Sequence, residues 1–110
     1  MNRRVGLRAR TDFAVVARDG ILAARCRGIE VSSGGIVLDR GRPVLSCHER
    51  IIMPLEMQLP ERHKPLFALA RPVWSFGTHQ AMKFVRISDV DRLTLAEHLD
   101  LLSMRGVGLC

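Results

Sequence analysis

Apolar and polar residues alternate in short runs over most of the chain, and small or polar turn residues separate the runs. The alternation is clearest at Leu55, Met57 and Leu59, which are separated by Glu56 and Gln58. A period of two is typical of a strand with one buried face. The pattern predicts six strands, at residues 13–17, 21–31, 36–38, 51–59, 66–76 and 81–87.

Turn residues fall between these runs. Asp19-Gly20 predicts a tight hairpin turn, and the small residues from Ser32 to Gly35 predict a second reversal. Pro72 lies inside the run 66–76 and cannot donate a ladder hydrogen bond, so that strand must lie at an edge or contain a bulge.

The period changes after residue 88 and predicts one helix. The sequence Ser88-x-x-Asp91 is typical of a helix N-terminus, because the Ser88 hydroxyl can accept an early backbone N–H and an acidic residue is favoured there. His98 lies off the leucine face and is expected at the surface. The leucines expected to share one face are Leu95, Leu99 and Leu102.

Six short strands followed by a helix predict a mostly β domain, an antiparallel barrel closed or nearly closed, with the helix laid against it. The length of 110 residues fits one domain. We expect a flexible basic arm at 1–10, the barrel at 11–87, the helix at 89–102 and a tail at 103–110. The four phenylalanines are expected to fill the core. No apolar run is long enough for a membrane span or a secretory signal.

The net charge of +6 is concentrated near the N-terminus, where residues 1–27 hold seven arginines against Asp12 and Asp19. Arginine is suited to bidentate phosphate contacts and to stacking on bases, so this patch indicates a partner with phosphates or nucleobases. The three cysteines have no paired spacing, which favours a reducing cytoplasm and no metal site. The four histidines are scattered along the chain with no evident pairing to a carboxylate or a nucleophile, so we expect no enzyme.

Two motifs carry candidate chemistry. Arg4-x-x-x-Arg8, with Arg3 beside it, is a fork of guanidinium groups able to close on an anionic ligand. Glu30-x-Ser32-x-x-Gly35 offers a carboxylate for a guanine edge, a hydroxyl, and a glycine that permits close approach. Taken singly, the first is also typical of a solvated basic arm and the second of an ordinary hairpin turn.

In this order and spacing, the two motifs resemble those of the PilZ domain family, and the likeness covers roughly residues 3–102. The resemblance implies a six-stranded antiparallel Greek-key barrel with a C-terminal helix. It also implies a cyclic di-GMP receptor without catalytic activity or cofactor. The residues implied as ligand-binding are Arg3, Arg4, Arg8, Glu30, Ser32, Gly35 and Trp74. The sequence departs from the family pattern at Glu30, where Asp or Asn is usual, and at Ala81, where Gly is frequent.

Within this resemblance, ligand capture orders the N-terminal arm and passes the signal to a downstream protein partner in the cytoplasm. One alternative is a PilZ-like protein-interaction module that has lost nucleotide binding. Another is a small barrel that binds nucleic acid, although no specific nucleic acid is expected because the chain has few aromatic residues for base stacking.

Overall fold

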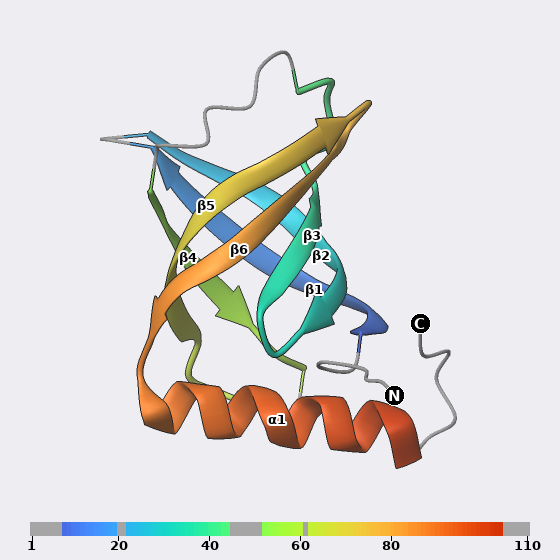
Figure 1. Cartoon of the computed structure of the whole chain (residues 1–110), viewed down its shortest axis with the longest axis vertical. Helices are drawn as coiled ribbons and strands as arrows, with labels where there is room; N and C mark the ends of the chain where they lie inside the picture. The colour runs from blue at the N-terminus through green and yellow to red at the C-terminus, as the bar shows by residue number, and fades with distance from the viewer. Residues whose placement is uncertain (1–7, 20–21, 45–51, 61, 105–110) are drawn as a thin grey trace.

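The computed structural model describes residues 8–19, 22–44, 52–60 and 62–104. All strand pairs in this part of the chain are antiparallel, and α1 lies across one end of the barrel that they form (Figure 1). The predicted six-stranded antiparallel barrel with a C-terminal helix is confirmed. The elements are β1 (Arg8–Asp19), β2 (Leu22–Ser32), β3 (Gly35–Asp39), β4 (Met53–Gln58), β5 (Leu66–Phe76), β6 (His79–Ile87) and α1 (Asp89–Met104).

The barrel closes through two ladders between strands that are distant in sequence. The strand order is β1-β2-β3-β6-β5-β4, so β3 pairs with β6 and β4 returns to β1. Residues 35–39 face residues 79–83 at the first of these ladders, and residues 14–17 face residues 55–58 at the second. Closure leaves no long unpaired strand edge among the described strands, which protects a small β protein from edge-to-edge association.

The core follows the alternation of the strands, with two exceptions among the phenylalanines. Phe13 is buried and Phe84 packs against the core, as expected. Phe67 and Phe76 are 55% and 82% exposed, so the expectation that all four fill the core is wrong. Phe67 lies between two buried neighbours and therefore points outward, and Phe76 is the last residue of β5.

Pro72 lies at a bulge, as its missing N–H requires. The register between β5 and β6 shifts between Pro72 and Trp74, while Pro72 itself is buried. The extra residue leaves both Val73 and Trp74 exposed on the same stretch of strand. The bulge therefore turns the Trp74 side chain to the outer surface of the barrel.

The first strand begins earlier than the sequence pattern predicted. Arg8, Ala9 and Arg10 are paired with Ser32, Val31 and Glu30, so residues 8–10 belong to β1 and not to a flexible arm. Ala9 is completely buried, which fixes the start of the strand against the core. The helix also ends later than expected, at Met104 instead of residue 102.

The helix begins with the expected cap. The Ser88 hydroxyl accepts a hydrogen bond from the N–H of Asp91 at 3.1 Å. A carboxylate oxygen of Asp91 in turn accepts the N–H of Phe67 at 3.3 Å and ties the helix to β5. The three leucines expected on the inner face are buried. Within the described residues, no helix is long and apolar enough to cross a membrane.

His98 is buried with only 3% of its surface exposed, so its predicted surface position is wrong. Thr11 Oγ1 and His98 Nε2 are 3.2 Å apart in a hydrogen bond. The imidazole also meets the Phe13 ring edge to face, with the ring centroids 5.6 Å apart. The start of β1 packs over this part of the helix, and a polar side chain with a partner is accommodated there.

Candidate functional site

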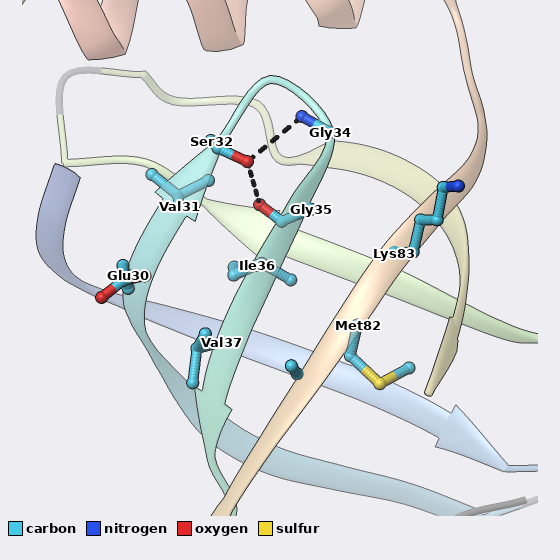
Figure 2. A pocket seen from close by; sticks show the side chains of 10 residues that line it. Glu30, Val31, Ser32, Gly34, Gly35, Ile36, Val37, Met82 and Lys83 are labelled. Atoms are coloured by element: carbon cyan, nitrogen blue, oxygen red, sulfur yellow. Dashed lines mark hydrogen bonds between the residues drawn. The ribbon is translucent and has the colours of Figure 1, made fainter. Parts of the chain in front are cut away.

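The β2–β3 hairpin is organised by the hydroxyl group of Ser32. Its Oγ accepts the N–H of Gly34 at 3.2 Å and donates to the carbonyl of Gly35 at 3.5 Å (Figure 2). A short side chain that bonds to the backbone two and three residues ahead stabilises a tight reversal. Ser32 therefore has a local structural role, which is to stabilise the β2–β3 turn.

Gly35 is required by the close approach of β3 to β6. A Cβ atom at this position would lie 2.4 Å from the carbonyl oxygen of Met82, a distance that real Cβ atoms do not adopt. The N–H of Phe84 donates to the carbonyl of Gly34 at 2.9 Å and holds the turn against β6. At Gly34, by contrast, an added Cβ would meet nothing within 4 Å. The motif glycine is thus part of the ladder that closes the barrel.

The strand registers align the sequence motifs in two adjacent rows across the sheet. In the first row, Arg8 of β1 is paired with Ser32 of β2, and Gly35 follows across the turn. In the second row, Arg10 is paired with Glu30. The second row continues through β3, β6 and β5 as Val37, Ala81 and Trp74.

Two hollows lie side by side over these rows, because Glu30 and Val37 line both of them. The first is about 270 Å³ in volume and lies over the turn, between β2, β3 and β6 (Figure 2). Its lining includes Glu30, Ser32, Gly35 and Lys83. The second is about 390 Å³ in volume and is lined by Arg10, Ile29, Glu30, Val37, Trp74 and His79.

Two arginines of the N-terminal patch have carboxylate partners in the described part of the chain. Arg27 donates to Asp12, with Nε 2.7 Å from Oδ1, and this contact raises the pKa of Arg27. Arg18 lies 3.8 Å from Glu56 of β4. Neither arginine lines the two hollows, whereas Arg10, among the described residues, lines the second one.

Asp39 is the last residue of β3 and is paired with His79, which lines the second hollow. Its carboxylate accepts the N–H of Gly41 at 2.9 Å, and this hydrogen bond holds the pKa of Asp39 below its usual value. Hydrogen bonding from Thr78 and the charge of nearby His79 act in the same direction. Asp39 is therefore ionised at neutral pH and belongs to the local turn structure.

No family model matches the sequence, and no curated protein matches it. Solved structures do match the fold. One is the inhibitor of motility MotI/DgrA from Bacillus subtilis, with a TM-score of 0.79 and 17% identity over 96% of this chain. This chain spans 53% of the length of that protein. Another is the PilZ domain of CeSA from a cellulose-synthesizing bacterium, with a TM-score of 0.62 and 12% identity. It covers 87% of this chain and 97% of that domain.

The chain has a PilZ-like fold. The structure brings three of the predicted ligand residues, Glu30, Ser32 and Gly35, to one hollow. Trp74 is 45% exposed and lines the neighbouring hollow. The predicted residues Arg3 and Arg4 lie outside the described part of the chain.

The PilZ-like barrel also places residues at the hollows that sequence reasoning did not select. Arg10 is two residues after Arg8 on the same strand, so the period of two would have identified it if the strand had been extended to this point. His79 and Lys83 come from β6, and only the β3–β6 register brings them close to the motif. Among the described residues, no cluster of His, Cys, Asp and Glu could hold a metal ion.

Proposed function

We propose that this chain is a receptor for cyclic di-GMP, acting in the cytoplasm, and that it binds the nucleotide at the two hollows beside the β2–β3 turn. The observation that carries the proposal is the register between Arg8 and Ser32. Arg8 and Ser32 belong to two motifs and are more than twenty residues apart in the sequence, and the register places them side by side on adjacent strands. The PilZ-like fold supports the same assignment.

Each residue has a role that suits its chemistry. Arg4 and Arg8, with Arg3 beside them, bind phosphates and stack on guanine rings. Glu30 lines both hollows and accepts hydrogen bonds from a guanine edge. Trp74 offers an aromatic face at the second hollow.

The binding test is calorimetric titration of cyclic di-GMP into the wild type and into Arg8→Ala. Loss of a charge-assisted contact of roughly 1.5–3 kcal/mol predicts at least about a tenfold weaker affinity. Arg25→Ala is the matched control, because Arg25 is an exposed arginine of β2 that lines neither hollow. Equal affinity in the wild type and Arg8→Ala would refute the assignment of the site.

We further propose that ligand binding orders the N-terminal arm and changes the surface that a partner protein recognises. One similar protein is named for the inhibition of motility, and the other is a PilZ domain from a cellulose-synthesizing bacterium.

A second candidate function is a protein-interaction module that has lost the nucleotide. The exposed apolar side chains at one end of β5 favour it, and they are Val73, Trp74 and Phe76. Scattered apolar residues are normal at a surface, but a group on one hairpin indicates a contact area. Saturating cyclic di-GMP that leaves the unfolding temperature unchanged would favour this function over the first.

A further inference from the structure

Two cations face each other across the β5–β6 ladder. Arg71 of β5 is paired directly with Lys83 of β6, and like charges in directly opposite positions destabilise a sheet. Neither β5 nor β6 contains an acidic residue. Among the described residues, neither side chain has a carboxylate partner. Within the described part of the chain, this hairpin therefore carries a pair of positive charges that no carboxylate compensates.

The pair lies at the end of the row that contains the motif residues. Lys83 is paired with Gly35 on its other side, so the row runs from Arg8 through Ser32 and Gly35 to Lys83 and Arg71. The chain neighbours of both cations are buried or turned inward, which places Arg71 and Lys83 on the outer face. Two strand spacings separate Gly35 from Arg71, about 10 Å along the sheet.

We propose that Arg71 and Lys83 form an anion subsite that binds one phosphate group of the nucleotide. This inference rests on the proposed function. The guanidinium of Arg71 donates in a fork that fits two phosphate oxygens, while the ammonium of Lys83 supplies a compact charge from the next strand.

Gly35 sits beside this subsite without a side chain, so a ligand over the turn can extend to the two cations unhindered. A bound phosphate cancels the repulsion within the pair. Binding is therefore favoured both by the new contacts and by relief of a cost that is present in the free protein.

The test compares Lys83→Met with Arg86→Met. Arg86 is an exposed cation on the same strand, outside the row, and its replacement removes the same net charge. Lys83→Met is expected to weaken cyclic di-GMP binding by about tenfold, which corresponds to about 1.4 kcal/mol, while Arg86→Met binds as the wild type does. Without ligand, Lys83→Met is expected to unfold at the same temperature as the wild type or higher.

Equal losses of affinity in the two variants, or wild-type affinity in Lys83→Met, would overturn the subsite. A lower unfolding temperature of ligand-free Lys83→Met would overturn it as well, because the pairing of Arg71 with Lys83 would then carry no cost that a phosphate could relieve. A second arm uses inorganic pyrophosphate and measures thermal stabilisation.

The pyrophosphate arm separates this inference from the proposed function. If the wild type binds no cyclic di-GMP, the proposed function fails. The anion subsite then stands if pyrophosphate raises the unfolding temperature of the wild type more than that of Lys83→Met. It falls if the two proteins respond equally.

Discussion

Replacing Gly35 with alanine tests whether the glycine of the second motif serves the fold or the ligand. The added Cβ would lie 2.4 Å from the Met82 carbonyl oxygen and 3.4 Å from the Lys83 Cα. Both atoms belong to the backbone of β6, so no flexible side chain can move aside. The variant must therefore separate β3 from β6 at one of the two ladders that close the barrel.

The expected loss of stability follows from this overlap. Forcing an extra methyl group into a packed site costs typically 1–3 kcal/mol. In a domain of this size, each kcal/mol shifts the unfolding temperature by about 4–8 °C. Gly35→Ala is therefore expected to unfold roughly 10 °C below the wild type, a value taken from the middle of these ranges.

Gly34→Ala is the matched control one residue away. Its added Cβ meets nothing within 4 Å, and Gly34 does not have a positive φ. Because alanine has less conformational freedom than glycine in the unfolded chain, Gly34→Ala is expected to raise the free energy of unfolding by about 0.4–1 kcal/mol. Thermal unfolding followed by circular dichroism compares the variants without nucleotide. An unfolding temperature of Gly35→Ala within a degree of the wild type would refute the close-approach explanation.

Two further perturbations test the contact between His98 of α1 and Thr11 of β1, and the lowered pKa of Asp39 at the end of β3. His98→Ala removes the hydrogen bond to Thr11 and leaves a cavity, so urea unfolding should show a free energy of unfolding lower by about 2–3 kcal/mol. His63→Ala in an exposed turn should leave the free energy of unfolding almost unchanged, and similar losses for both variants would contradict the packing of His98. Because the N–H of Gly41 lowers the pKa of Asp39 in the folded state, its stabilisation is present above the usual carboxyl pKa of 3.8 and is lost as the pH falls below that value. Urea midpoints measured from pH 5 to pH 2 should therefore fall less for Asp39→Asn than for the wild type, and parallel curves would contradict this.

Most of the fold could be predicted from local pattern. The alternation at Leu55 and Met57 gave the inner face of β4, and Pro72 required the bulge that β5 contains. The start of β1 could not be predicted in the same way. Its inward residue is Ala9, which is too small to mark an apolar period, and the register shift after Arg10 interrupts the alternation.

The candidate site was predictable where its residues are close in sequence. Ser32 and Gly35 belong to one turn, so their proximity follows from local geometry. Lys83 and Trp74 reach the same region only through the β3–β6 and β5–β6 registers, which depend on barrel closure. The burial of His98 likewise depends on a β1 contact that lies 87 residues away in the sequence.

The location of the nucleotide is the central claim, and an amide NMR titration of the wild type with cyclic di-GMP tests it most directly. The largest shifts are expected at Arg10, Glu30, Gly35 and Lys83, which line the two hollows, with smaller changes along α1. Shifts confined to residues outside the hollows, or no shifts at a saturating concentration, would contradict the account.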